Sequence, residues 1–304
     1  MAQPPRPAPA ARSVTGGVFL ALGAFGMWGV FPVYFKAVAS VPAAEVLCHR
    51  IVWSALFGAI LITALGQWPA VAEALARRRI VLTLAASAIV VSCNWVVFIW
   101  AVAHDHVLES SLGYYISPLV NVLLGTIVLH ERLDRLQWIA VAIAAAGVLY
   151  QTIALGTLPW ISLALAVSWG LYGLIRKVVE VEALPGLFIE TLILTPFALA
   201  WLGWLAAHGS GAFGAGGAYM DVLLALSGVL TAMPLILFVA GARRLPLTTL
   251  GLLQYTVPTL HFLMAVVVFK EPFGPERLVT FACIWLGLAL YSTATWRHRP
   301  ATKA

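Results

Sequence analysis

The chain has 304 residues, of which 62% are hydrophobic and only 10% are charged. A soluble domain carries about 25% charged residues, so this composition all but excludes a soluble fold. Long apolar runs recur along the whole chain without alternating polar positions. This pattern disfavours a transmembrane β-barrel and predicts an all-α polytopic membrane protein.

The predicted elements begin with a tail, because residues 1–15 are rich in Pro and Ala and are expected to be disordered on the cytoplasmic side. The first apolar run, from Gly17 past Val33, is too long for a signal peptide, so we interpret it as a membrane helix. Further runs follow, each long enough to cross about 30 Å of hydrocarbon, and a second cytoplasmic tail is expected at 297–304. The ten predicted membrane helices are 17–38, 44–64, 80–101, 108–129, 136–153, 159–176, 186–206, 221–241, 247–269 and 278–296.

The Lys and Arg residues predict the orientation of these helices. Ten crossings put both termini on the same side of the membrane. With that side in the cytoplasm, fourteen of the 18 Lys and Arg residues are cytoplasmic and four are outside. This bias follows the positive-inside rule and predicts a multi-pass protein of the cell inner (plasma) membrane with both termini in the cytoplasm. It also explains the net charge of +6 without a nucleic-acid partner.

The two halves of the chain repeat each other. The stretch "MWGVFPVYFK" at 27–36 shares Trp, Gly and Lys, at the same offsets, with "SWGLYGLIRK" at 168–177. Later, "YISPLVNVLLGTIVLHE" at 115–131 aligns with "YTVPTLHFLMAVVVFKE" at 255–271. Each repeat has five predicted helices, and because five is odd, the second repeat enters the membrane from the opposite side. Inverted repeats are typical of secondary transporters, in which a central site opens alternately to the two faces.

Several motifs spread over residues 17–296 belong together: "WGVFPVYFK", "EVLCHRIVWS", "NWVVFIWAV", "ESSLGYYISPLVNVLLG", "ERLDRLQWIAV", "GLFIETLIL", "TTLGLLQYTVPTLHFLMAV" and "FACIWLGLALY". By these motifs the chain resembles the drug/metabolite transporter (DMT) superfamily, and within it the EamA-like branch called the RarD, or chloramphenicol-sensitivity protein, family. The resemblance implies an inner-membrane protein of ten helices that transports a solute. It also implies that the predicted repeats, 16–153 and 157–296, are two EamA units.

One position in each repeat departs from the pattern of the superfamily. His130 and Lys270 stand where the superfamily often has Gly before a Glu. The Glu residues that follow, Glu131 and Glu271, each precede a predicted helix. A carboxylate favours the positive end of the helix dipole, so we expect both to stabilise a helix N-terminus.

Charged residues inside the predicted helices are candidates for function. A charge at the centre of a membrane helix costs about 2.5–3.5 kcal/mol on insertion scales, so it should have a partner or a role. Glu190 has no cation nearby in the sequence, and its carboxyl group can bind and release a proton. His49 is its equivalent in the first repeat. With Glu45 and Arg50 it can form a buried network that gates the outer side or responds to pH, although a plain interfacial network would have the same sequence.

Further polar and aromatic residues lie deep in the predicted helices. Asn121 and His261 are equivalent between the repeats, and each follows a Pro, Pro118 or Pro258, by three residues. A Pro frees a backbone carbonyl and bends the helix, so the backbone and a nearby side chain can contact a substrate. Hydrogen bonding between helices is the alternative. The candidates for substrate binding or coupling are Glu190, His49, Asn94, Trp95, Tyr115, Asn121, Gln254, His261 and Trp28.

The first helix of each repeat contains a residue that weakens a helix. Pro32 in the first repeat corresponds to Gly173 in the second. We predict that both helices bend or thin there and that Pro32, like Pro118 and Pro258, takes part in gating. The neighbouring Trp-Gly pair is expected either to line the cavity or to allow close helix packing.

No motif for catalysis, nucleotide binding or metal binding is present in the sequence. It contains no P-loop, HExxH or GxSxG, and its three Cys residues stand singly in apolar runs. We therefore expect no enzyme activity, no cofactor and no metal. The sequence predicts secondary active transport of a small organic solute through the lipid bilayer, with protons as the candidate coupling ion. A non-transporting membrane scaffold or regulator is the alternative, and the sequence leaves both a monomer and a homodimer open.

Overall fold

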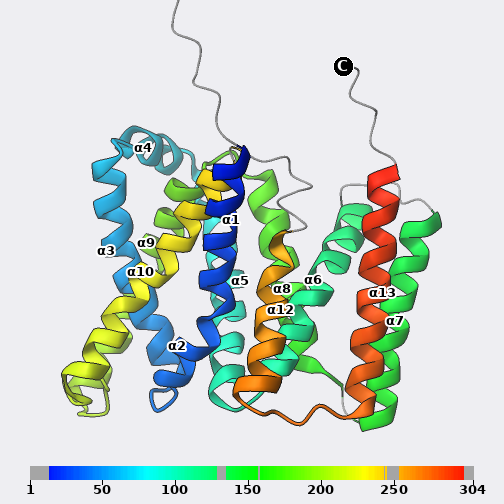
Figure 1. Ribbon diagram of the computed structural model, residues 1–304. Coiled ribbons are helices and arrows are strands. Elements are labelled where there is room, and N and C mark those ends of the chain that lie inside the picture. Colours follow the sequence, from blue (N-terminus) through cyan, green and yellow to red (C-terminus); the bar gives the residue numbers. More distant parts are fainter. Residues whose placement is uncertain (1–13, 129–134, 157, 243, 245–252, 298–304) are drawn as a thin grey trace, which may run out of the picture.

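Every regular element in the described part of the chain is a helix (Figure 1). The computed structural model describes residues 14–128, 135–156, 158–242, 244 and 253–297. The helices are α1 (Val14–Gly29), α2 (Phe31–Ala37), α3 (Ala43–Ala64), α4 (Trp68–Ala76), α5 (Arg78–Ala103), α6 (Val107–Val128), α7 (Arg135–Leu155), α8 (Trp160–Val178), α9 (Ala183–Ala207), α10 (Gly217–Ala242), α12 (Thr256–Leu263), the π-helix η1 (Met264–Val268) and α13 (Pro275–Arg297). The expected tails at 1–15 and 297–304 lie outside the described residues except at their inner ends, where Val14 starts α1 and Arg297 ends α13.

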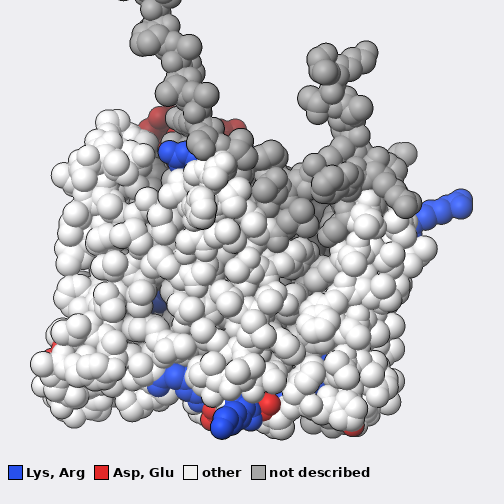
Figure 2. All heavy atoms as spheres, in the orientation of Figure 1, with Lys and Arg blue, Asp and Glu red and all other residues white. Residues whose placement is uncertain are grey.

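The long helices stand side by side between two edges of the molecule, and α4 lies across the upper edge (Figure 1). Charged side chains gather near the two edges, and the face between them is almost free of charge (Figure 2). This is the surface that a bilayer requires, and it confirms the prediction of an all-α, multi-pass membrane protein. Six described segments are long and apolar enough to cross a membrane: Thr15–Ala37, Ala43–Ala64, Arg78–Ala103, Arg135–Ala154, Ala183–Ala207 and Gly217–Phe238. Two shorter apolar helices are Trp160–Arg176 and Thr256–Val268.

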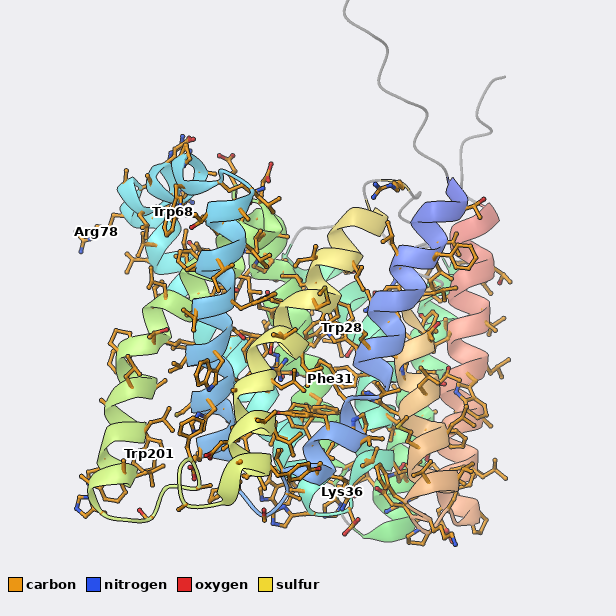
Figure 3. The ribbon with its side chains drawn as sticks, turned by 60° about the vertical axis from the view of Figure 1, so that its left-hand side comes forward. Trp28, Phe31, Lys36, Trp68, Arg78 and Trp201 are labelled. Atoms are coloured by element: carbon orange, nitrogen blue, oxygen red, sulfur yellow. The ribbon has the colours of Figure 1, made fainter. Side chains whose placement is uncertain are left out.

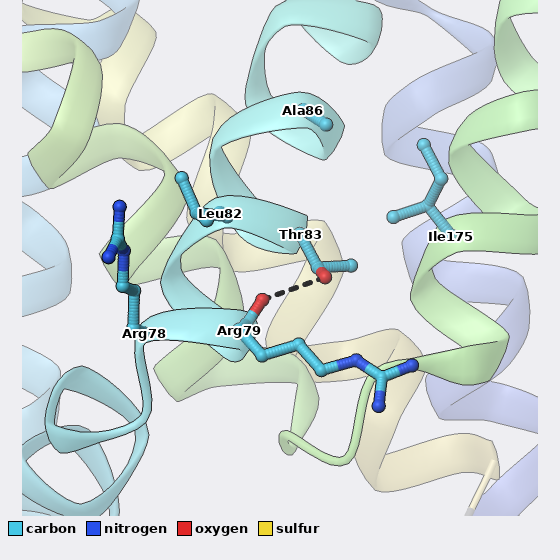
Figure 4. Close-up of a pocket in the computed structure, with 6 residues that line it drawn as sticks. All are labelled: Arg78, Arg79, Leu82, Thr83, Ala86 and Ile175. Carbon is cyan, nitrogen blue, oxygen red and sulfur yellow. Dashed lines mark hydrogen bonds between the residues drawn. The ribbon is translucent and has the colours of Figure 1, made fainter.

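The first helices of the two halves run in opposite directions. Lys36, near the end of α2, pairs with Asp105, which follows the end of α5. Ile175, near the end of α8, faces the same groove as Arg79 at the start of α5 (Figure 4). Because α5 is one continuous helix of 26 residues, α2 and α8 end at its opposite ends.

The packing of the helices has the same two-fold relation as the sequence. Under the predicted repeat, α1–α2 corresponds to α8, α3 to α9, α5 to α10, α6 to α12 and α7 to α13. Three equivalent pairs pack on each other directly, namely α3 with α9, α6 with α12, and α7 with α13. The other main contacts occur as matched pairs: α1–α10 corresponds to α8–α5, and α1–α12 corresponds to α8–α6. Nearly every extensive contact therefore joins one half to the other.

Glycines allow the closest helix crossings. A Cβ atom added to Gly228 of α10 would collide with backbone atoms of Trp53 in α3. A Cβ atom at Gly29 would collide with Cδ1 of Leu260 in α12. Small residues at such crossings let backbones approach, which is how helices associate in lipid. Close packing is thus the observed role of the Gly in the Trp-Gly pair of the first repeat.

The predicted bend or thinning at Pro32 is seen as an interruption of the helix, whereas no interruption occurs at Gly173. The chain leaves α1 at Gly29 and re-enters a helix at Phe31, with Pro32 in the first turn of α2. Helix α8 continues as a regular α-helix through Gly173. A Pro removes a backbone N–H group, but a Gly keeps it. In lipid, where no water competes for the backbone, that N–H keeps its helical hydrogen bond.

Candidate functional site

A buried arginine lies where helices of both halves meet. Arg50 of α3 is only 5% exposed, and its Nε donates a hydrogen bond to Oγ1 of Thr231 in α10 at 2.8 Å. Its guanidinium group lies 4.1 Å from the centre of the Trp95 ring of α5. The rings of Phe31 and Phe35 of α2 are each 5.7 Å away. These two Phe residues are four positions apart and so share one face of α2.

Hydrogen bonds hold the walls of this region together. The amide nitrogen of Asn94 donates to the carbonyl oxygen of Leu165 at 3.1 Å and to Oγ of Ser168 at 2.9 Å, which ties α5 to α8. The hydroxyl group of Tyr114 donates to Oδ1 of Asn94 at 3.4 Å. The hydroxyl group of Tyr34 donates to the carbonyl oxygen of Leu223 at 2.9 Å. Asn94 therefore joins helices in this conformation.

The backbone carbonyl group that Pro32 leaves without a donor has a hydrogen-bond partner in the other half. A Pro at position 32 leaves the carbonyl oxygen of Trp28 without its helical N–H donor. Nε2 of His261, in α12, lies 3.1 Å from this oxygen. Because a carbonyl oxygen only accepts, Nε2 carries the proton and donates it. The imidazole ring stacks on Phe98 at 5.3 Å between ring centres. Trp28 and Phe31 lie at mid-height between the two edges, which Arg78 and Lys36 mark (Figure 3).

Replacing His261 by leucine should lower the free energy of unfolding by about 2 kcal/mol, because it leaves the buried carbonyl group of Trp28 unpaired. In a Pro32→Ala background the loss should be smaller by about 1 kcal/mol, because that substitution restores a backbone N–H group as a donor to the same carbonyl. Thermal unfolding of the four proteins of this double-mutant cycle in detergent measures both values.

The matched control is His208→Leu. His208 contacts the carbonyl oxygen of Trp204 at 2.8 Å but is exposed, so its replacement should change stability by less than about 0.5 kcal/mol. If His261→Leu lowered the free energy of unfolding equally in the wild-type and the Pro32→Ala backgrounds, the contribution of His261 to stability would not depend on Pro32.

Glu190 has a cation partner that its sequence neighbourhood does not show. The carboxylate, on α9, is 1% exposed, and its Oε1 lies 3.7 Å from Nη1 of Arg176 near the end of α8. The hydroxyl group of Tyr172 donates to its Oε2 at 3.4 Å. An added Cβ at Gly186 would collide with the same Nη1, so this Gly makes room for the arginine. Glu190 is therefore part of an ion pair between α8 and α9.

Glu45 and His49 lie together at the start of α3, and Arg50 points away from them. Nε2 of His49 is 3.9 Å from Oε1 of Glu45. The same oxygen accepts a hydrogen bond from the backbone N–H of Ala212 at 2.6 Å. The ring of Phe213 covers the imidazole at 5.1 Å between ring centres. This cluster fastens the loop between α9 and α10 over the start of α3.

The other predicted residues whose side chains the structure describes have different surroundings. Tyr115 shares a 2.8 Å hydrogen bond with Thr259, and its ring packs edge-on against Phe281 and Trp285 of α13. The side chain of Gln254 is exposed. The carbonyl oxygen of the buried Pro258 accepts a hydrogen bond from Ser111 at 2.8 Å. The side chains of Pro118 and Asn121 lie outside the described part of the structure.

Glu271 caps a helix of the opposite half. Its Oε1 accepts from the N–H of Val107 at 2.7 Å and its Oε2 from the N–H of Leu108 at 2.8 Å, at the start of α6. Burial raises the pKa of the Glu271 carboxyl group, while these two N–H groups pull it the other way. The expectation of a helix cap is thus met, but on α6 and not on the helix that follows Glu271. Glu131 lies outside the described residues.

An open groove of about 620 Å³ lies at the upper edge, between the start of α5 and the end of α8 (Figure 4). It is lined by Arg78, Arg79, Leu82, Thr83, Ala86 and Ile175. Oγ1 of Thr83 donates to the carbonyl oxygen of Arg79 within the same helix. Because none of the predicted site residues faces this groove, it is separate from the buried region around Arg50.

The fold and its buried polar residues define a membrane protein built from two interlocked inverted halves. Comparison with known proteins identifies its family. Residues 15–152 and 158–293 each match the EamA-like transporter family. The chain is 46% identical over 281 residues to Protein RarD of Salmonella typhi, across 92% of this chain and 96% of that protein. It is 44% identical over 276 residues to an uncharacterized transporter of Vibrio cholerae, across 91% of each chain. The chain therefore belongs to the EamA-like transporter family of the DMT superfamily, which confirms the resemblance seen in the sequence.

A solved structure shares the fold. One chain of a protein crystal structure superposes on this chain with a TM-score of 0.59 and is 17% identical in sequence. The superposition covers 92% of this chain and 98% of that chain. At this identity the likeness supports the arrangement of helices and nothing about the site.

Proposed function

We propose that the protein is a secondary active transporter that moves a small organic solute across the cell inner membrane by alternating access. The observation that carries this proposal is the interlocked packing of two inverted halves, whose helix contacts come in matched pairs. In such an arrangement the halves can exchange conformations, so a site between them opens to each face in turn. Arg50 and His261 are buried and contact residues of the opposite half, and Glu190 is buried as well.

We assign ten crossings, with α1 and α2 forming one, α12 and η1 forming another, and α4 lying at the surface. The basic run at residues 77–79 lies at the upper edge, where Arg78 is labelled in Figure 3, and α1 starts and α13 ends at the same edge (Figure 1). At the lower edge, Lys36 pairs with Asp105, and Arg277 lies 3.9 Å from Glu109. The positive-inside rule then makes the upper edge cytoplasmic and places both termini inside.

The lower edge is closed by contacts between the halves. Glu271 of the second half holds the start of α6 in the first. Glu45 of the first half holds Ala212 of the second. These hydrogen bonds join the halves at this edge, which supports the proposal that opening toward the outside would have to break them.

Glu190 is the proposed proton-binding residue. Its negative charge supports the ion pair with Arg176, which joins α8 to α9. A proton on the carboxylate removes that attraction and weakens the link between the two helices. Proton binding on one side of the membrane would thereby favour one conformation, which is what coupling requires.

Solute flux into proteoliposomes, with and without an imposed pH gradient, tests this proposal. We expect flux to be stimulated by the gradient in the wild-type protein, and this stimulation to be lost in Glu190→Gln, which cannot bind and release a proton. The matched control is Glu180→Gln, because the Glu180 side chain is 88% exposed at the cytoplasmic edge. Solute flux that does not respond to the pH gradient and is unchanged by Glu190→Gln would contradict proton coupling at this residue.

A further inference from the structure

We infer that the transported solute carries a carboxylate group and that Arg50 binds it. This inference rests on the proposed transport function and names the class of substrate. The site would consist of the guanidinium group of Arg50, the hydroxyl group of Thr231, and the aromatic rings of Trp95, Phe31 and Phe35.

Arg50 has no negatively charged partner among the described residues. Two other cations of the bundle do have one: Lys36 pairs with Asp105, and Arg176 pairs with Glu190. Only the Nε of Arg50 has a hydrogen bond to a described residue. The two terminal nitrogens, which are the bidentate edge of the guanidinium group, have none.

A buried charge without a counter-charge is unfavourable. Removing it from water is only partly offset by cation–π contacts such as that with Trp95 at 4.1 Å. The phenol groups nearby belong to Tyr34 and Tyr114, and their hydroxyl groups donate to Leu223 and Asn94. No described group around Arg50 therefore supplies the negative charge, and an anionic ligand would.

The number of charges favours a carboxylate over a phosphate. A guanidinium group binds either anion through two parallel hydrogen bonds. A phosphate monoester, however, carries a charge of about −1.5 to −2 at neutral pH and is usually held by a cluster of Arg residues. A single cation matches a single negative charge. The aromatic rings around it favour a solute with an apolar body attached to the carboxylate.

The position of Arg50 suits a substrate site in an alternating-access protein. It lies seven residues after the start of α3, which places it about 10 Å from the outer end of that helix. Its neighbours come from α2 and α5 of the first half and from α10 of the second. A movement of one half against the other would therefore change the surroundings of the cation.

The test compares solutes that differ only in charge. Proteoliposomes with the full-length protein are given a panel of aromatic and aliphatic carboxylates, the matching primary amides and phenyl phosphate, together with a whole-cell metabolite extract. Uptake is followed by mass spectrometry. We expect carboxylates to enter at least about tenfold faster than their amides, which corresponds to one charge-assisted hydrogen-bond pair.

Variants assign this preference to Arg50. Arg50→Gln should lose the uptake of carboxylates, and Arg50→Lys should keep part of it, because Lys retains the charge but not the planar fork. Thr231→Val keeps the charge of Arg50 but removes the hydrogen bond that positions its guanidinium group, so it should reduce the uptake of carboxylates. This variant keeps the inference testable if Arg50→Gln does not fold. Arg78→Gln removes an exposed cation at the opposite edge and should behave as wild type.

The possible results separate this inference from the proposed function. Movement of amides or phenyl phosphate but not carboxylates would overturn the inference and leave transport standing. Carboxylate uptake that is equal in wild type, Arg50→Gln and Thr231→Val would do the same. If no solute in the panel or the extract moves in any protein, the proposed transport function fails, and the inference fails with it.

Discussion

Replacing Gly228 by alanine should lower the free energy of unfolding by about 3 kcal/mol, the upper part of the range for an overpacked site. The new methyl group would collide with the backbone carbon and oxygen of Trp53. Backbone atoms of a helix cannot rotate aside as a side chain can, so α10 would have to move away from α3. That movement would also lengthen the hydrogen bond between Arg50 and Thr231, one turn further along α10.

The control for this prediction is Gly203→Ala in α9. No atom lies within 4 Å of a Cβ added at this position. Here the substitution should raise stability by about 1 kcal/mol, because alanine favours a helix over glycine by that amount. Thermal unfolding in detergent gives both values. If Gly228→Ala were also neutral or stabilising, the close contact between α3 and α10 would not exist in the folded protein.

Replacing Glu271 by alanine should lower the free energy of unfolding by about 3 kcal/mol. The substitution leaves the N–H groups of Val107 and Leu108 without an acceptor in a buried position, and each unpaired group costs about 1–3 kcal/mol. Glu271→Gln keeps one acceptor oxygen and should lose less. Hydrogen exchange measured by mass spectrometry should show faster exchange at the start of α6 in Glu271→Ala.

The control for Glu271 is Glu73→Gln, which removes an exposed charge. Glu73 pairs with Arg77 at 2.6 Å, but the side chain of Glu73 is 68% exposed. Its loss should change stability by about 0.5 kcal/mol or less. If Glu271→Ala also lowered the free energy of unfolding by only about 0.5 kcal/mol, the hydrogen bonds from the second half would not stabilise the start of α6.

The sequence predicted those features that depend on local pattern. Apolar runs of helical length, the repeat of 140–141 residues and the break at Pro32 all follow from residues that are close together in the chain or equivalent between its halves. The continuity of α8 through Gly173 has a physical cause, since a Gly weakens a helix without removing a hydrogen bond. In lipid that difference decides whether the helix breaks.

The partners of the buried polar residues could not be predicted, because they come from distant segments. Glu190 has no nearby cation in the sequence, yet α8 brings Arg176 to it. Arg50 stands next to His49 and near Glu45, which suggested one network. Adjacent residues of a helix point about 100° apart, and the guanidinium group instead faces Thr231. Thr231 is one of a few hydroxyl residues in an apolar helix, and nothing in the sequence indicates its contact with Arg50.

The interlocked packing of the halves has a consequence for synthesis in the cell. Arg50 meets Thr231, which follows 181 residues later, and α7 meets α13 only when the last helix has been made. Until then, the helices of the first half lack the partners of their main packing surfaces. The repeat in the sequence indicates a duplicated gene. The unit that folds is nevertheless both halves together, because the first half reaches its main contacts only after the second has been synthesised.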